Sequence, residues 1–423
     1  MKETLLYRIK EGVRDMCYIW TKEMRQTVTD EGVLIFFLLV PILYPLLYSW
    51  AYSNELVREV PVAVVDLSHS HQSREFIREF DATPDAKVAY YCNSLDEARA
   101  LVGKQVVHGV LYFPTDFQTN VLRMEQSHVG VYCDMSLMLA YKAIFQSAQA
   151  VASNMSSKMQ IALSGNYTDR EDQISTKPLE FEEVPVFNPT GGYGSFLIPG
   201  VLILIIQQTM LLGIGLAAGT ARESNRYHDL VPVSRHYNGI FRIVLGKSMA
   251  YFMIYAVIAA YLTIIVPRLF GFTSLLSGAP LLALMVPYIL SCIFFGMMLS
   301  CLVRYRENVI LLVVFTSLPF LFLSGISWPQ SSIPGAWRSI ATLLPSTFGM
   351  RGFIRINGMG ATLSDIRLEY QALWVLTIVY FFATCLVYRF QIIAAHNHAN
   401  ERIRVLKEKA HAVRVRKEAG EQS

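Results

Sequence analysis

Residues 196–218 read FLIPGVLILIIQQTMLLGIGLAA and contain no Asp, Glu, Lys, Arg or His. A helix needs roughly 20 apolar residues to cross about 30 Å of hydrocarbon, so this run predicts a membrane span. Five more uncharged runs of comparable length occur along the chain, at residues 33–52, 248–266, 279–302, 309–327 and 372–388. The sequence therefore predicts an all-α membrane protein built around a six-helix transmembrane bundle.

The composition agrees with this interpretation. Of the 423 residues, 53% are hydrophobic and 17% are charged, whereas soluble domains carry about 25% charged residues. This balance disfavours a disordered or nucleic-acid-binding protein, and six cysteines are too few for a disulfide framework. The first apolar run is not expected to be a cleaved signal, because it begins only at residue 33 and is too long.

The distribution of Lys and Arg predicts the orientation. The N-terminal segment, the two alternate loops and the C-terminal tail hold six, five, two and eight, or 21 in all, against 5 in the remaining short loops. The positive-inside rule therefore places both termini in the cytoplasm. Residues 1–32 are expected to form a cytoplasmic amphipathic helix on the membrane surface, with a short solvated helix as the alternative. Its apolar residues are Leu5, Ile9, Met16, Ile19 and Trp20.

Residues 53–195 separate span 33–52 from the other five and are long enough for a core of their own. They carry 11 basic and 18 acidic residues. Period-two runs predict strands at 61–65, 87–92, 106–113 and 128–133, and helices are expected at 72–80, 95–102 and 134–163, followed by a loop at 164–189. We expect an inserted extracytoplasmic α/β domain. Cys92 and Cys133 could form a disulfide there or remain as two free thiols.

Sequence motifs for catalysis are scarce. Gly246-Lys247-Ser248 ends like a phosphate-binding loop, but the glycine required five residues earlier is Phe241. His396, His398 and Glu401 lie in the basic cytoplasmic tail, residues 394–423, and are expected to be a solvated face rather than a metal site. We predict no enzyme active site, no bound metal and no cofactor in this chain.

The middle of the second run carries Gln207, Gln208 and Thr209. These side chains are expected either to hydrogen-bond to neighbouring helices or to line a substrate path. No ionisable group lies within any of the six apolar runs, although ion-coupled carriers need such groups in the membrane. A transport protein of this kind would therefore take its energy from another source.

The cytoplasmic loop 220–247 is charged and is interrupted by a proline, so we expect a short helix, a turn and a second helix that enters the membrane. Such a lever is suited to docking a soluble partner that does mechanical work, although a simple solvated connection would have the same composition. The candidate docking residues are Arg222, Glu223, Arg226, Asp229, Pro232, Ser234, Gly246 and Lys247.

This loop resembles the coupling region of type-2 ABC (ATP-binding-cassette) export permeases. That family has a glutamate after its second span, a Pro-Val/Ile-Ser step and a Gly-Lys pair that enters the third span, which here are Glu223, Pro232-Val233-Ser234 and Gly246-Lys247. A second similar stretch is the outer segment after the fifth span. Its matching residues are Gly325, Pro329, Pro334, Trp337, Leu344-Pro345-Ser346-Thr347, and Arg351 or Arg355.

The layout also resembles the subgroup with a large outer domain, which here starts at Val60-Pro-Val-Ala-Val-Val-Asp66. The resemblance implies five spans within residues 196–393, with residues 328–356 forming short re-entrant helices. It implies the permease subunit of an exporter in a bacterial inner membrane, moving an amphiphilic, drug-like or lipid-like substrate. ATP and Mg would be bound by a partner ABC ATPase.

Further partners implied are a second permease subunit, identical or paralogous, a periplasmic adaptor and an outer-membrane channel. No nucleic acid is expected among the partners. Two other classes remain open from the residues alone. One is an ion-coupled secondary carrier, and the other is a membrane-anchored receptor or scaffold.

Overall fold

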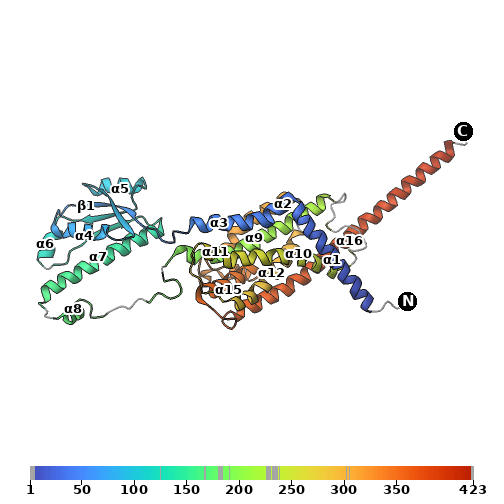
Figure 1. The fold of residues 1–423 in the computed structure, drawn as a ribbon. Coiled ribbons are helices and arrows are strands. Elements are labelled where there is room, and N and C mark those ends of the chain that lie inside the picture. The colour runs from blue at the N-terminus through green and yellow to red at the C-terminus, as the bar shows by residue number, and fades with distance from the viewer. Residues whose placement is uncertain are drawn as a thin grey trace. The chain divides into compact units, whose positions relative to one another are not determined.

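The computed structural model describes residues 5–420 except 124, 166–167, 180–183, 190, 225–229, 231–236, 238, 302 and 304. The chain divides into two compact units (Figure 1). Residues 1–53 and 186–423 form one unit, which we call the helical bundle. Residues 54–185 form the other, which we call the α/β unit.

Six helices of the described chain are long and apolar enough to cross a membrane, which confirms the predicted number. The first is continuous through α2 (Glu31–Leu34), the π-helical turn η1 (Ile35–Leu39) and α3 (Val40–Ala51). The second is α9 (Tyr193–Ser224), and the third combines α10 (Ile240–Ala260), η3 (Tyr261–Ile265) and α11 (Val266–Leu269). The others are α12 (Gly278–Ser300), α13 (Arg306–Leu323) and α16 (Arg367–Gly420).

The helices extend beyond the apolar runs that predicted them. Helix α9 continues past Ala218 to Ser224, and α10 begins at Ile240, before the apolar run starts at Ser248. Polar and charged residues can extend a helix that has already formed, because each residue added gains a hydrogen bond and only that residue's backbone has to be fixed. The charged ends of the helices therefore belong to the bundle and not to separate loops.

Helix α9 lies at the centre of the bundle, and 89% of its apolar segment is buried. It packs against α12, α13 and α15 and against the first span. Gly213 makes one of these contacts possible, because a Cβ atom there would lie 1.5 Å from Cδ2 of Phe37. The central position of α9 explains why its sequence is apolar on all sides.

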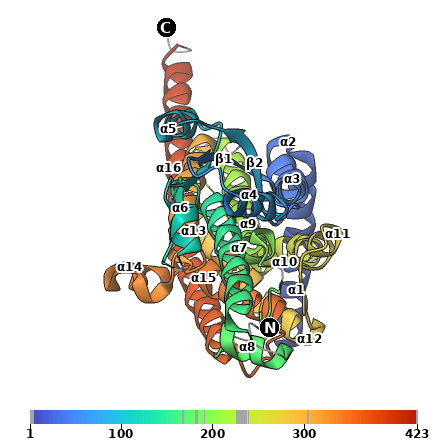
Figure 2. The same ribbon diagram turned by 90° about the vertical axis from the view of Figure 1, so that its left-hand side faces the viewer.

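Three short helices follow α13, namely η4 (Gln330–Ser332), α14 (Gly335–Ala341) and α15 (Pro345–Met359). Pro329 and Pro334 precede η4 and α14, and Pro345 is the first residue of α15, where a proline lacks no hydrogen bond that the helix needs. Figure 2 shows α14 projecting sideways from the bundle, and Trp337 on it is 54% exposed. Helix α15 is buried against α9, α12 and α16.

The α/β unit contains a four-stranded sheet in the order β2-β1-β3-β4. Strands β1 (Val60–Asp66), β2 (Ala86–Tyr91) and β3 (Gly109–Phe113) are parallel, and β4 (Gly130–Cys133) is antiparallel to β3. Helix α4 (His71–Asp81) contributes to the core on one face of the sheet, and α5 (Leu95–Gly103) contributes to the core on the other. The predicted strands and these two helices are confirmed, and none of their ends differs from the prediction by more than three residues.

Three expectations about this unit need correction. The predicted helix 134–163 is α7 (Met138–Ser164), which starts later because the carboxylate of Asp134 accepts a hydrogen bond from the Ser136 amide and forms a turn. Helices α6 (Phe117–Leu122) and α8 (Asp169–Thr176) were not predicted. Within the described chain Cys92 and Cys133 are free thiols, because β2 and β4 form opposite edges of the sheet. The possible disulfide between them is therefore not formed.

Candidate functional site

Helix α1 (Leu5–Thr29) packs along α10 at the end of the bundle that carries the chain's N-terminus (Figure 1). Its buried side chains recur every four residues, as Asp15, Ile19, Glu23 and Thr27. This spacing places them on one face of the helix. The buried face therefore includes two acidic residues, and of the predicted apolar residues Met16, Ile19 and Trp20 it contains Ile19.

The acidic residues of α1 meet basic residues of α10. Oδ2 of Asp15 lies 2.6 Å from Nη1 of Arg242, and both carboxylate oxygens of Glu23 lie 2.8 Å from Nζ of Lys247. The hydroxyl of Tyr251 also donates to Glu23. Lys247 is 7% exposed and Glu23 is 3% exposed, so this ion pair is buried. Removing one partner of such a pair is costly, because the other charge stays buried without compensation.

Gly246 lets the two helices approach closely. A Cβ atom at this position would lie 3.0 Å from Cβ of Ile19 and 3.1 Å from the carbonyl oxygen of Met16. The predicted Gly246-Lys247 pair therefore lies at the buried contact with α1. The sequence predicts both residues as part of the docking loop 220–247, where the chain enters the third span, but it does not predict their contact with α1.

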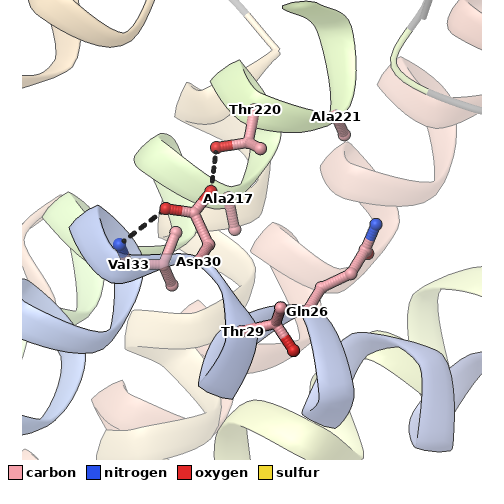
Figure 3. A pocket seen from close by; sticks show the side chains of 7 residues that line it. All are labelled: Gln26, Thr29, Asp30, Val33, Ala217, Thr220 and Ala221. Atoms are coloured by element: carbon pink, nitrogen blue, oxygen red, sulfur yellow. Dashed lines mark hydrogen bonds between the residues drawn. The ribbon is translucent and has the colours of Figure 1, made fainter. Parts of the chain in front are cut away.

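A second group of charges joins the first span to α9 and α13. Asp30 accepts hydrogen bonds from the Val33 amide at 3.2 Å and from the Thr220 hydroxyl at 2.7 Å, as Figure 3 shows. The guanidinium of Arg306, at the start of α13, donates to the same carboxylate. Burial raises the pKa of Asp30, but these three hydrogen bonds outweigh it and hold the pKa below its usual value.

A small pocket of about 210 Å³ lies beside Asp30 (Figure 3). Its walls come from the end of α1, the start of the first span and the last turns of α9, and the lining residues are Gln26, Thr29, Asp30, Val33, Ala217, Thr220 and Ala221. Two of its polar residues, Asp30 and Thr220, are hydrogen-bonded to each other. This pocket therefore marks a junction between three helices.

Arg222 and Glu223 lie in the last turn of α9. The guanidinium of Arg222, 4% exposed, donates to the carbonyl oxygens of Val303 and Cys301, with 2.8 Å to the latter. It thus satisfies carbonyls that the end of α12 leaves without a helical partner. The carboxylate of Glu223 lies 4.0 Å from Nε of Arg306, and its side chain is 43% exposed.

The predicted docking residues therefore have different environments. Glu223 is accessible, whereas Arg222, Gly246 and Lys247 hold helices together inside the bundle. Arg226, Asp229, Pro232 and Ser234 lie outside the described residues. We refer below to the charged and polar residues that connect α1, the first span, α9, α10 and α13 as the α1 cluster, which comprises Asp15, Glu23, Asp30, Thr220, Arg222, Glu223, Arg242, Lys247, Tyr251 and Arg306.

The partner residues Asp15, Glu23, Asp30 and Arg306 were missed at the sequence level. A faint signal was present, because Asp15, Ile19, Glu23 and Thr27 follow helical spacing. That spacing predicts a shared face but does not show that the face is buried. The basic partners lie more than 220 positions away, since Arg242 pairs with Asp15 and Lys247 with Glu23.

The middle of α9 presents uncharged polar groups to the bundle core. Oε1 of Gln207 accepts a hydrogen bond from the Ser346 amide, in the first turn of α15, at 2.7 Å. Thr209 accepts one from the Tyr255 hydroxyl at 3.0 Å. Among the residues that the structure describes, neither polar atom of the Gln208 side chain has a hydrogen-bond partner, although Gln208 is 8% exposed.

The outer segment also contains an ion pair. Arg355 on α15 lies 3.2 Å from Glu369 on α16, and the side chain of Glu369 is 9% exposed. Thr347 is fully buried in the first turn of α15, and its hydroxyl has no hydrogen-bond partner in the described chain. Gly325 adopts a φ of 86°, a conformation that favours glycine. These residues fix the path of the chain between α13 and α16.

Comparisons with known proteins agree with this architecture. A family model described as "ABC-2 family transporter protein" matches residues 32–386. The chain is 21% identical over 374 residues to the "Probable multidrug ABC transporter permease YbhR" of Escherichia coli (strain K12), which covers 85% of this chain and 94% of that protein. The protein of the same name from Escherichia coli O157:H7 gives the same values. The matches extend over most of both units.

Proposed function

Because the chain belongs to the ABC-2 family of transporter proteins, and is thus a multi-pass permease subunit of an ABC exporter, we propose that a separate ATPase subunit drives it through the α1 cluster. The ATPase subunit would bind ATP and Mg and hydrolyse the ATP, and this chain would form the path that the substrate takes through the membrane. In such transporters, ATP hydrolysis by a separate subunit would drive transport through the membrane-spanning chain. The lack of ionisable residues in the predicted apolar runs supports the same division of labour.

The observation that carries the proposal is the position of Glu223. It is an accessible acid at the end of the central helix α9, and it faces Arg306 on α13. Arg306 in turn binds Asp30 at the start of the first span. A force applied at Glu223 would therefore reach α9, α13 and the first span together, while the ion pairs of α1 link the same end to α10.

We place both chain termini in the cytoplasm and the α/β unit on the opposite side of the membrane. The excess of Lys and Arg, 21 against 5 in the alternate loops, supports this orientation. Two permease subunits, identical or paralogous, would enclose the path. A periplasmic adaptor and an outer-membrane channel would be reached through the α/β unit.

The substrate is proposed to be amphiphilic, drug-like or lipid-like. The path would pass Gln208 on α9, because a buried amide without a partner among the described residues can be satisfied by a ligand or by a second subunit. The name of the Escherichia coli relative, a multidrug permease, is consistent with a substrate of this chemistry. The uncharged surroundings of Gln208 suit molecules that carry both apolar and hydrogen-bonding groups.

Charge reversal at Glu223 tests the coupling. We expect Glu223→Arg to insert normally and to co-purify with less ATPase subunit, and we expect ATP-dependent efflux to fall at least about tenfold, as for loss of a charged hydrogen-bonded contact. The matched control is Glu307→Arg, which reverses an exposed acid at the first turn of α13. Export at the wild-type rate from Glu223→Arg would refute the coupling role.

A further inference from the structure

The α/β unit contains a crevice where two neighbouring strands send the chain to opposite faces of the sheet. After β1 the chain enters α4, and after β2 it enters α5. These helices lie on opposite faces of the sheet (Figure 1). Strands β1 and β2 are adjacent and parallel, so their carboxyl ends meet at one edge. In open α/β sheets, ligands bind in the crevice at such a switch point.

A pocket of about 410 Å³ occupies this crevice. A volume of this size lies within the range of small-molecule sites, about 300–1,000 Å³. Val64 of β1 and Ile77 of α4 are buried side chains on its apolar side. The polar lining comes from the ends of both strands and from α4, as Asp66, His69, Arg74, Arg78, Tyr91 and Asn93.

Both carboxylates of the pocket already accept hydrogen bonds from within the protein. Asp66 accepts hydrogen bonds from the amides of Ser68 and His69, both at 3.0 Å, and from the Ser73 hydroxyl at 2.7 Å. Asp81 accepts one from the Val88 amide at 2.8 Å. These contacts fix the strand-to-helix turn and the edge of β2. Most of the accepting capacity of Asp66 is therefore used within the protein.

The basic side chains of the pocket are less engaged. Arg74 donates one hydrogen bond, 3.4 Å long, to the carbonyl oxygen of His69. The guanidinium of Arg78 forms no hydrogen bond with any residue that the structure describes. Both arginines are exposed and lie one turn apart on α4, a spacing that puts them on the same face. Their donor groups are available to a ligand.

The charge balance of the crevice differs from that of the unit as a whole. Residues 53–195 hold 11 basic and 18 acidic residues, so an anion would be repelled by most of this surface. In the crevice two arginines balance the two carboxylates, Asp66 and Asp81, so an anion meets less repulsion there than elsewhere on this acidic unit. Guanidinium groups bind carboxylates and phosphates through paired hydrogen bonds.

We propose that this crevice binds a small organic anion whose carboxylate or phosphate group pairs with Arg74 and Arg78. The apolar part of the anion would lie against Val64 and Ile77, and the exposed ring of Tyr91 would cover it. This site belongs to the α/β unit alone. It therefore does not depend on the transport path or on the partner ATPase.

The test uses the full chain in lipid nanodiscs and isothermal titration calorimetry. The probes are phenyl phosphate and benzoate as anions, benzyl alcohol as a neutral analogue and benzylammonium as a cation. We expect the two anions to bind and the neutral and cationic analogues to bind at least about tenfold more weakly. Stronger binding of phenyl phosphate or of benzoate would identify which acid the site prefers.

Arg78→Gln is the informative variant, and Arg99→Gln is its control. Arg99 is exposed on α5, does not line the pocket and carries the same charge. We expect Arg78→Gln to weaken anion binding about tenfold and Arg99→Gln to leave it nearly unchanged, with both variants folded by circular dichroism. Equal binding of benzyl alcohol, absence of anion binding, or equal weakening by the two variants would each overturn the proposal.

Discussion

The α1 cluster and the middle of α9 handle polar groups in opposite ways. In the α1 cluster, charged side chains meet opposite charges or helix-end carbonyls, as in the pairs Glu23–Lys247 and Asp15–Arg242. The middle of α9 uses neutral side chains, and Gln208 has no partner in the described part of the chain. Ionised groups are costly in the membrane interior. The bundle thus concentrates charge where helices are joined and leaves neutral, incompletely paired groups in the middle of α9, where we propose that the substrate passes.

The largest effect is expected from breaking the buried pair of the α1 cluster. Lys247→Met leaves Glu23 buried without its cation, since Tyr251 is then its remaining neutral donor. We expect the free energy of unfolding in mixed micelles to fall by about 3–5 kcal/mol. The measurement is equilibrium unfolding of the purified chain followed by circular dichroism.

The double variant Glu23→Met/Lys247→Met is the control for this prediction. It replaces both charges with apolar groups of similar length, so no buried charge remains uncompensated. We expect it to recover most of the lost stability, because apolar replacement of a whole buried pair is often neutral or stabilising. A double variant as unstable as Lys247→Met would show that packing, and not charge, explains the single substitution.

A smaller effect is expected in the middle of α9, where two adjacent glutamines should differ. Gln207→Leu leaves the buried Ser346 amide without its acceptor, which we expect to cost about 1–3 kcal/mol of stability. Gln208→Leu removes an amide that has no partner in the described chain, so we expect unchanged or slightly higher stability. Equilibrium unfolding of both variants measures the difference.

Transport assays extend the comparison of Gln207→Leu with Gln208→Leu from stability to function. We expect Gln208→Leu to reduce efflux although the protein is stable, because we propose that this amide lines the substrate path. Full efflux from Gln208→Leu would remove Gln208 from the path. Equal destabilisation by the two substitutions would contradict the distinction between a paired and an unpaired amide.

The spans were predictable because hydrophobic length is a local property of the chain. Residues 196–218 identify α9 without knowledge of any neighbour. The strands of the α/β unit were likewise visible in alternating runs. Helix α8 could have been found, because the Thr168 hydroxyl accepts a hydrogen bond from the Glu171 amide at its start, and Thr and Glu at this spacing are a helix-start signal.

The α1 cluster was not predictable in the same way. Lys247 was predicted to be a docking residue, because its loop is charged and no local pattern points to Glu23. Lys247 is buried because α1 packs on α10. Similarly, Cys92 directly follows β2 and Cys133 is the last residue of β4, but the strand order that separates them is set by long-range pairing. Partners across the fold depend on tertiary structure that spacing alone does not contain.

The close approach of α1 and α10 gives a third prediction. Gly246→Ala adds a Cβ atom 3.0 Å from Cβ of Ile19 and 3.1 Å from a backbone oxygen of Met16. We expect the free energy of unfolding to fall by about 1 kcal/mol, because the backbone of α1 must shift to relieve the overlap. Gly358→Ala is the control, since a Cβ atom there meets nothing within 4 Å. Equal melting temperatures for both variants would contradict a tight contact.

The smallest effect concerns pH at the junction near Asp30. The folded-state pKa of this carboxyl lies below its ordinary value of 3.8, since hydrogen bonds from Thr220, Val33 and Arg306 outweigh the effect of burial. A depressed carboxyl pKa stabilises the fold above the unfolded-state pKa, and this contribution is lost as pH falls through the folded-state value. We therefore expect Asp30→Asn to be less stable than the wild type at pH 7, with the difference shrinking below about pH 4.

Thr220→Val sharpens this last comparison. It removes one of the three hydrogen bonds to Asp30 and leaves those from Val33 and Arg306. The pH dependence of its unfolding should therefore be intermediate between those of the wild type and Asp30→Asn. A difference in stability between the wild type and Asp30→Asn that stays constant from pH 7 to pH 3 would mean that the packing of the Asp30 side chain, and not its charge, stabilises the fold. The junction of the first span, α9 and α13 would then depend on packing rather than on charge.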